Sequence, residues 1–158
     1  MTAEEIIRLL NLKPHPEGGF FRETYKSQAT LPGIQPSRNI STAIYYMLVQ
    51  GTVSKMHRLV SDEVFHFYMG DPVTWVMLEA QGTVERTVLG SALERGEVPQ
   101  MSVKAGTWFG GFLSDGGKFA LMGTTMAPGF EFEDFTLGNR GDLLAKFPHA
   151  ERDILRLT

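Results

Sequence analysis

Cysteine is missing from this chain of 158 residues. Without a thiol, the protein has no disulfide bond, no thiolate nucleophile and no cysteine-ligated metal site. Scaffolds held together by disulfides and active sites that depend on cysteine are therefore excluded.

Long apolar runs and runs of like charge are also missing. The longest apolar stretches have the length of a strand, well short of the roughly 20 residues that a membrane-spanning helix needs. A formal net charge of −3 argues against nucleic-acid and anionic-membrane partners, because these select basic surfaces. Glu4 and Glu5 indicate a folded N-terminal helix rather than a signal peptide. We expect a cytoplasmic protein with no nucleic-acid and no membrane partner.

Turn-forming residues, by contrast, are plentiful. Seventeen glycines and eight prolines predict many turns, which favours an all-β core. The length is that of one domain, and no linker, repeat or low-complexity segment divides it. Residues 1–158 are therefore predicted to form a single domain.

Short candidate strands follow one another with turn signals between them. This spacing, with no long helix between strands, is typical of antiparallel hairpins in a sandwich or barrel. Residues 27–38 are expected to form a loop and residues 90–98 a polar excursion. The predicted strands are 20–26, 41–49, 52–59, 64–69, 73–80, 83–89, 100–103, 107–113, 118–126 and 130–137.

Helices are expected only at the two ends of the chain. Thr2 and Glu5 have the spacing of a capping box, and the helix that they begin is expected to end near residue 11. Residues 15–19, which contain Pro16 and two glycines, are predicted to form a turn. Residues 141–147 and 151–157 are expected to form one or two short helices.

The segment from Gly51 to Gly70 carries the most specific pattern. His57, Leu59 and Glu63 follow Gly51 at intervals that resemble the first cupin motif, in which a glycine precedes His-x-His, Glu and Gly. The second histidine of the motif is Leu59 here. This resemblance implies a cupin fold, the double-stranded β-helix or jelly-roll barrel.

The second cupin motif, Pro-x-Gly-x-x-His, is resembled by residues 104–109. The glycine is kept, but Lys104 replaces the proline and Phe109 replaces the histidine. Three imidazoles and a carboxylate would complete a site for a divalent metal, whereas this chain keeps one imidazole and one carboxylate. We therefore expect no metal and no cofactor.

His57 and Glu63 are the candidate catalytic residues. His57 and Leu59 lie two apart on a strand and share a face, which in a barrel points inward. A buried carboxylate needs a donor, and for Glu63 this is His57 or Arg58. His57 and Glu63 are therefore predicted to line a pocket as an acid–base pair or a substrate-orienting pair, with Leu59 and Phe109 on its wall.

Three further stretches, residues 15–25, 61–68 and 128–138, resemble the hallmarks of the fifth cupin family, long known only as a domain of unknown function. The resemblance covers nearly the whole chain. It implies a jelly roll with short N- and C-terminal helices outside the barrel, and a homodimer. Sheet edges need cover, and strand 20–26 is the one expected to pair with a partner's edge.

A second resemblance concerns the deoxysugar-nucleotide 3,5-epimerases of the cupin superfamily. Residues 18–23 are similar to their Arg-Gly-x-Phe-x-Glu stretch, with Gly18 in place of the arginine. This similarity implies that Phe21 and Glu23 bind a ligand, and Tyr25 is expected on the same strand face. No match to the catalytic lysine and tyrosine of these enzymes is found.

Two functions of different classes follow from these residues. The first is a metal-independent enzyme, an isomerase, epimerase or lyase, in which His57 and Glu63 move a proton next to a carbonyl. The second is a non-catalytic module that binds a small metabolite, sugar-like or nucleotide-like, in the same pocket. A purely structural role is the third. The sequence does not separate the first two.

Overall fold

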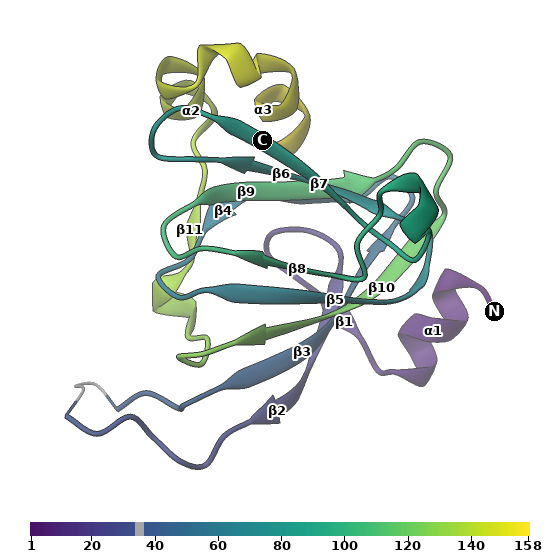
Figure 1. Cartoon of the computed structure of the whole chain (residues 1–158). Coiled ribbons are helices and arrows are strands. Elements are labelled where there is room, and N and C mark those ends of the chain that lie inside the picture. Colours follow the sequence, from purple (N-terminus) through teal and green to yellow (C-terminus); the bar gives the residue numbers. More distant parts are fainter. Residues whose placement is uncertain (34–36) are drawn as a thin grey trace.

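The computed structural model describes residues 1–33 and 37–158, and its strands form two facing antiparallel sheets (Figure 1). The six-stranded sheet has the order β1 (Lys13–Pro14), β2 (Phe20–Lys26), β3 (Thr42–Val49), β10 (Phe119–Met126), β5 (Glu63–Gly70) and β8 (Gln100–Val103). The five-stranded sheet has the order β11 (Thr136–Leu137), β4 (Val53–Arg58), β9 (Trp108–Leu113), β6 (Val73–Leu78) and β7 (Val84–Leu89). The predicted all-β jelly-roll architecture is confirmed.

Alternation of side chains along the strands creates the interior. In β8, Met101 and Val103 are buried while Gln100 and Ser102 are exposed, the period of two that a half-buried strand requires. The inward side chains of both sheets meet in one core, in which Phe65 of β5 packs on Trp75 of β6 with ring centroids 4.2 Å apart. The same core includes Leu59 and Met126, which also border an open cavity.

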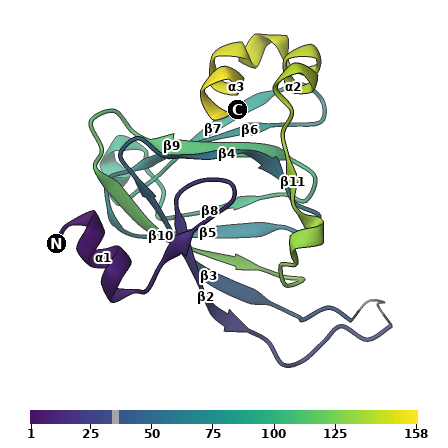
Figure 2. The same cartoon turned by 180° about the vertical axis from the view of Figure 1, so that it is seen from behind.

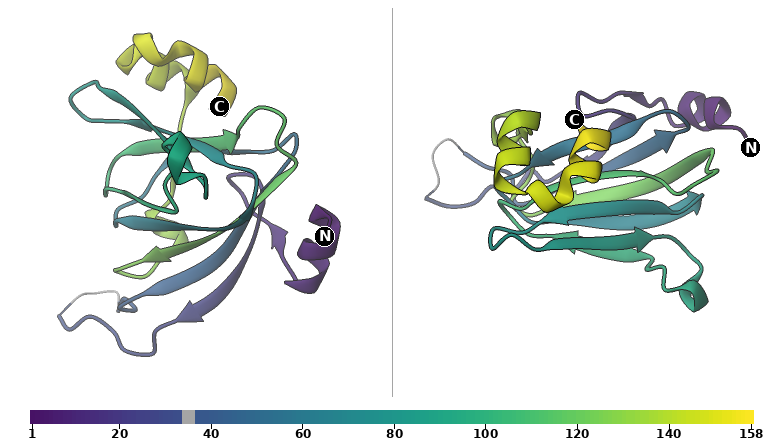
Figure 3. Two further views of the ribbon diagram at one scale, coloured as in Figure 1. Left: turned by 45° about the vertical axis from the view of Figure 1, so that its right-hand side comes forward. Right: turned by 90° about the horizontal axis from the view of Figure 1, so that it is seen from above.

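Short helices cover the outside of both sheets (Figures 2 and 3). Helix α1 (Ala3–Leu9) begins with the predicted capping box of Thr2 and Glu5 and packs Ile6 on the outer face of β3 and β10. Helices α2 (Arg140–Lys146) and α3 (Glu151–Leu157), joined by η3 (Pro148–Ala150), cover the five-stranded sheet. None of the helices in the described part of the chain has the length and apolarity to cross a membrane.

The prediction of a strand over residues 130–137 is wrong. The chain there forms the short helix η2 (Phe132–Asp134) and pairs with β4 only at β11. The sequence pattern is that of alternating aromatic and acidic residues, but an ion pair between Arg38 and Asp134 holds the segment across the barrel mouth instead of along a sheet. The polar excursion at 90–98 contains η1 (Leu93–Arg95). Part of the predicted loop at 27–38, residues 34–36, lies outside the described residues.

Candidate active site inside the barrel

A cavity occupies the end of the barrel at which β10 leads into the 127–135 segment. The cavity, counted together with the open solvent at its mouth, measures about 650 Å³. Its walls are mostly apolar, with Phe21, Ile44, Leu59, Met126, Phe130 and Phe135 among them. Set into these walls are six side chains with ionisable groups, His15, Glu17, Glu23, Tyr46, His57 and Glu63. An apolar hollow with a few convergent polar groups is typical of a small-molecule site.

The turn at residues 15–19 brings two of these groups into the barrel. In Figures 1 and 2 it lies between the two sheets, next to β4. The Glu17 carbonyl accepts the Lys55 N–H at 2.8 Å, and the Gly18 carbonyl accepts the Tyr46 hydroxyl at 2.9 Å. Gly18 has φ of +112°, and a Cβ there would lie 2.1 Å from the Val53 carbonyl oxygen. Only glycine allows this close approach, which fixes His15 and Glu17 beside β4.

Glu17 is the carboxylate partner of His57. Glu17 Oε2 lies 3.1 Å from His57 Nε2, and Glu17 Oε1 accepts a hydrogen bond from the Ser54 hydroxyl at 3.1 Å. The His57 side chain is 2% exposed and that of Glu17 is 11% exposed, so the carboxylate is the member of the pair nearer to the open space. The predicted pairing of His57 with Glu63 is corrected: among the described residues, the carboxylate within 4.0 Å of a His57 ring nitrogen is that of Glu17.

The hydrogen bonds of His57 require a shared proton. His57 Nδ1 lies 2.6 Å from the Lys55 carbonyl oxygen, and because a carbonyl only accepts, Nδ1 carries a hydrogen and donates it. In a neutral ring Nε2 would then hold a lone pair facing the Glu17 carboxylate, two acceptors in contact. A proton between Nε2 and Oε2 removes this conflict. The two side chains therefore form a unit that holds one proton between them.

Glu63 is a protonated acid at neutral pH. It begins β5 and is 7% exposed. Burial in the cavity wall, together with the negative charge of Glu17, raises the pKa of Glu63 to about 8, and a hydrogen bond with Thr124 opposes this increase only in part. Arg58, the other predicted partner, instead lies over the ring of Trp108, 4.8 Å from its centroid. A carboxylic acid that keeps its proton at pH 7 is a proton donor.

The other residues predicted to line the pocket do not all reach it. Phe21, Glu23 and Leu59 line the cavity. Phe109 lies behind His57, with ring centroids 4.1 Å apart, and is not one of the lining residues. Tyr25 is 54% exposed and lies outside the lining. The register between β2 and β3 shifts between Glu23 and Tyr25, and this bulge breaks the alternation that placed both residues on one face.

His15 and Glu17 were not among the predicted site residues because both lie in a segment predicted to form a turn. Turn residues are normally solvent-exposed, whereas this turn folds into the barrel. The available signal was the pair Gly18-Gly19 after them, since two glycines with positive φ permit a close backbone approach.

The side chains do not fit the metal site of the cupin pattern. Two positions of that pattern are Leu59 and Phe109, and both nitrogens of His57 already contact Lys55 and Glu17. Within residues 1–33 and 37–158, no three histidine, aspartate or glutamate side chains are arranged to hold a metal ion. The site therefore offers proton donors and acceptors rather than a ligand set.

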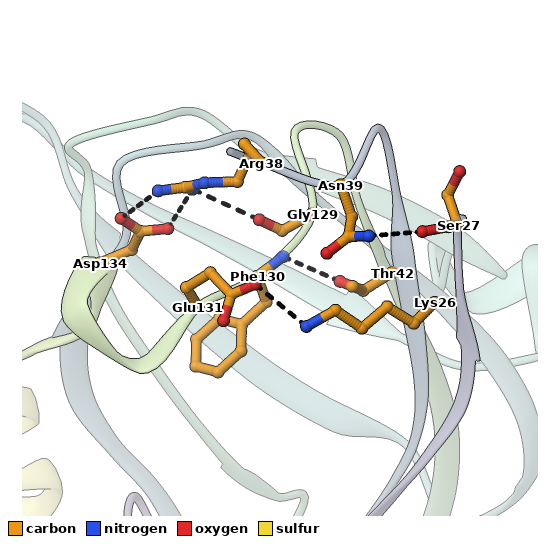
Figure 4. Close-up of polar contacts among 9 residues, drawn as sticks. All are labelled: Lys26, Ser27, Arg38, Asn39, Thr42, Gly129, Phe130, Glu131 and Asp134. Carbon is orange, nitrogen blue, oxygen red and sulfur yellow. Dashed lines mark hydrogen bonds and ion pairs between the residues drawn. The ribbon is translucent and has the colours of Figure 1, made fainter. Parts of the chain in front are cut away.

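Polar contacts fasten the aromatic wall at the cavity mouth (Figure 4). Arg38 pairs with Asp134 and donates to the Gly129 carbonyl at 3.3 Å. The Phe130 N–H donates to the Thr42 hydroxyl at 2.9 Å, and Lys26 donates to Glu131 at 3.0 Å. These bonds join the end of β2 and the start of β3 to the segment that carries Phe130, Phe132 and Phe135 into the cavity lining.

Comparison with known proteins places this geometry among proteins of the same fold. The sequence model of the family described as Cupin superfamily (DUF985) matches residues 4–138. The uncharacterized protein YML079W of Saccharomyces cerevisiae is 30% identical, over 85% of this chain and 74% of the yeast protein.

Solved structures extend the comparison. Protein SO0799 from Shewanella oneidensis superposes with a TM-score of 0.93 at 37% identity, covering 100% of this chain and 98% of that one. A hypothetical protein from Leishmania major gives 0.93 at 30% identity, covering 100% and 99%. Oxalate decarboxylase from Bacillus subtilis gives 0.57 at 15% identity, covering 92% of this chain and 36% of that one, which is a likeness of fold alone.

Proposed function

This chain belongs to the cupin superfamily, in the family DUF985, and we propose that it is a metal-independent enzyme that moves a proton next to the carbonyl group of a small molecule. The isomerases, epimerases and lyases that begin with enolisation form this reaction class. One observation carries the proposal. A Glu17–His57 unit with one shared proton and a protonated Glu63 face the same cavity.

The two carboxyl groups have opposite states because their surroundings differ. Glu17 Oε2 lies beside His57 Nε2 and Glu17 Oε1 accepts a hydrogen bond from the Ser54 hydroxyl, whereas burial keeps Glu63 neutral. A pair of titratable groups with divergent proton affinities supplies a base and an acid at one pH. The apolar walls exclude water and strengthen both effects.

The proposed step balances as follows. Glu17 takes a proton from the carbon next to the ligand carbonyl. The electron pair of the C–H bond forms a C=C bond, and the pair of the C=O π bond moves to oxygen. Glu63 gives its proton to that oxygen, leaving an enol and a Glu63 carboxylate. For epimerisation, the enol hydroxyl returns its proton to Glu63 and the carbon receives a proton on its other face. For isomerisation, the first carbon must bear a hydroxyl, which gives its proton to Glu63 while Glu17 returns a proton to the former carbonyl carbon. For elimination, the enol hydroxyl returns its proton to Glu63 as the neighbouring leaving group departs.

Deuterium exchange tests this proposal. A panel of small ketones, hydroxyketones and aldoses, with hydroxyacetone as the simplest hydroxyketone, is incubated with the protein in D₂O, and loss of the carbon-bound proton is followed by NMR. We expect Glu17→Gln, His57→Asn and Glu63→Gln each to slow exchange by about 10² to 10⁴-fold. Glu85→Gln, on the exposed face of β7, is the matched control and should exchange like the wild type.

The alternative, a non-catalytic binding protein for a sugar-like or nucleotide-like metabolite, is favoured by the aromatic lining. His57 stacks on Phe135 with ring centroids 5.2 Å apart, and flat apolar surfaces of this kind hold a ligand without reacting with it. Binding of a panel member, seen as line broadening, without any exchange above the buffer rate would support the binding protein and reject the enzyme.

We also propose that the protein forms a homodimer through the outer edge of β2. Within the described residues, β1 pairs with β2 only at Phe20 and Phe21, and β2 lies near the rim of its sheet in Figure 1. The remaining length, Arg22 to Lys26, offers backbone groups to a second strand. Light scattering at micromolar concentration should give the mass of two chains, and the mass of one chain would contradict the dimer.

A further inference from the structure

His15 has a buried ring whose orientation is fixed by aromatic neighbours. Its side chain is 8% exposed. The ring meets Phe21 edge-on with centroids 4.6 Å apart, and Tyr46 and Phe135 at 5.9 Å and 6.4 Å. His15 also lines the cavity. Three edge contacts leave the imidazole little freedom to rotate, so its two nitrogens keep distinct surroundings.

One of those nitrogens is an acceptor. The Glu17 backbone N–H donates to His15 Nδ1 at 3.2 Å. A backbone N–H cannot accept, so Nδ1 holds a lone pair and the ring hydrogen is on Nε2. Glu17 Oε2 is 3.7 Å from the same Nδ1, beyond hydrogen-bond distance, and does not compete for a proton there. The turn that carries His15 therefore selects its tautomer.

The His15 ring is neutral at and above pH 7. Burial lowers the pKa of His15, and the neighbouring His57 lowers it further, against the opposing charge of Glu17. These are the titratable groups that act on the ring, and the remaining contacts are aromatic. A neutral imidazole with hydrogen on Nε2 is a hydrogen-bond donor that carries no net charge.

We propose that His15 donates a hydrogen bond from Nε2 to the carbonyl oxygen of the bound ligand, as a further catalytic residue of this site. The hydrogen bonds of the described residues include none from His15 Nε2, so this donor is free for a ligand in the cavity that the ring lines. The catalytic part of the inference rests on the proposed enolisation, but the tautomer and the free donor do not.

The donor acts where negative charge develops. When Glu17 removes the carbon-bound proton, charge accumulates on the carbonyl oxygen, and the His15 N–H bond to that oxygen shortens and strengthens. His15 keeps its proton throughout, because Glu63 supplies the one that is transferred. The oxygen has two lone pairs, so both donors have a place on it. Loss of one such donor typically slows a reaction by about 10² to 10³-fold.

The tautomer is tested on the free protein by long-range ¹H–¹⁵N NMR. We expect His15 to show a protonated Nε2 and an unprotonated Nδ1 from pH 7 to pH 8. His15→Gln identifies the signal by its loss, and the exposed His149 provides the signal of a second imidazole for comparison. A hydrogen on Nδ1, or an imidazolium at neutral pH, would overturn the inference whatever the protein catalyses.

The donor role is tested by two substitutions in the exchange assay. His15→Phe keeps the ring and removes the donor, while His15→Gln keeps an N–H₂ donor on a flexible chain. We expect His15→Phe to slow hydroxyacetone exchange by about 10² to 10³-fold and His15→Gln to retain more of the rate, with melting temperatures showing that both variants fold. His149→Gln is the control for loss of a histidine.

The outcomes separate the two proposals. The first outcome is that folded His15→Phe loses less than tenfold of the exchange rate, while the wild type is active and Glu17→Gln is inactive. This outcome would reject the donor role of His15 and retain the proposed enolisation. An inactive wild type would reject the enolisation, and the donor would then be judged by titration with hydroxyacetone. A shift of the His15 Nε2–H signal on titration supports the donor, and no shift rejects it.

Discussion

Two regions of the space between the sheets are lined by different kinds of side chain, aromatic in one and ionisable in the other. At one end, Trp75, Phe65 and Phe109 fill the interior with rings 4.2 to 6.1 Å apart. At the other, Glu17 and Glu63 face an open cavity. The packed end resembles any protein core, whereas the open end carries buried ionisable groups at a cost in stability. The difference is consistent with the proposal that the cavity serves chemistry rather than folding.

Leu59 and Phe109 mark the boundary between the two ends. Both occupy positions where the cupin pattern has histidines, and both are buried, at 5% and 1% exposure. Phe109 packs on His57 from the core side. The apolar replacements therefore extend the core up to the single histidine that remains, and they make its surroundings drier.

The largest loss of stability from a single substitution is expected in the packed end. Trp75→Ala should lower the free energy of unfolding by about 3 to 5 kcal/mol, because it leaves a cavity among fully buried side chains. Trp75→Phe should cost less, since Nε1 of Trp75 has no hydrogen-bond partner among the described residues and the substitution removes that donor. Urea denaturation measures both. Equal losses in the two variants would contradict the account of this core.

Glu63, in the open end, should make the stability of the protein depend on pH. The pKa of Glu63 is near 8 in the folded protein and near 4.3 when unfolded, so between these values the folded state binds a proton that the unfolded state has lost. Its stability should fall as pH rises, by about 1.4 kcal/mol per pH unit, and the loss should be complete above pH 8. Below pH 4 both states are protonated and the effect vanishes.

Glu63→Gln isolates this contribution. The difference in unfolding free energy between Glu63→Gln and the wild type should grow in favour of the variant from pH 5 to pH 8, and Glu85→Gln should show no such trend. Denaturant titrations at four pH values are sufficient. A difference that stays constant with pH would show that Glu63 is ionised in the folded protein.

The ion pairs at the cavity mouth should contribute less to the free energy of unfolding. Asp134→Asn removes the charge that pairs with Arg38, whose side chain is 18% exposed, and should cost about 1 to 3 kcal/mol. Lys26→Met breaks the more exposed pair with Glu131 and should cost at most about 1 kcal/mol. Thermal unfolding compares the two, and a larger loss in Lys26→Met would contradict the ranking.

The smallest effect is expected from metal removal. Since the side chains around His57 do not form a cupin ligand set, a chelator should leave the melting temperature unchanged, and elemental analysis should find no stoichiometric zinc, iron, manganese or nickel. A bound metal that is lost in His57→Ala would overturn this expectation.

The sequence predicted the fold well because its signals are local. Gly, Pro and Asp mark the turns, and alternation marks strands such as 100–103, which the structure reproduces without change. The strand predicted at 130–137 failed because the Arg38–Asp134 pair, which redirects that segment, joins residues 96 positions apart. No local pattern contains such a contact.

The candidate site was predicted in part for the same reason. His57, Leu59 and Glu63 lie within one strand–turn–strand unit, so motif spacing was enough to place them in one interior. Glu17 reaches His57 from a turn that lies 40 positions earlier and passes between the sheets. Tyr25 was misplaced by a bulge that alternation cannot reveal. The features of the site that the sequence did not predict depend on tertiary contacts.

The most direct test of the account is the carboxyl titration of Glu63. The protein is labelled with ¹³C at glutamate side chains, Glu63→Gln identifies the resonance, and its chemical shift is followed from pH 4 to pH 9. The account predicts a midpoint near pH 8, so that Glu63 is an acid beside the Glu17–His57 unit at neutral pH. A midpoint near 4.5 would leave Glu63 ionised at neutral pH, with no proton to give to the ligand oxygen, and would contradict the proposed proton transfer.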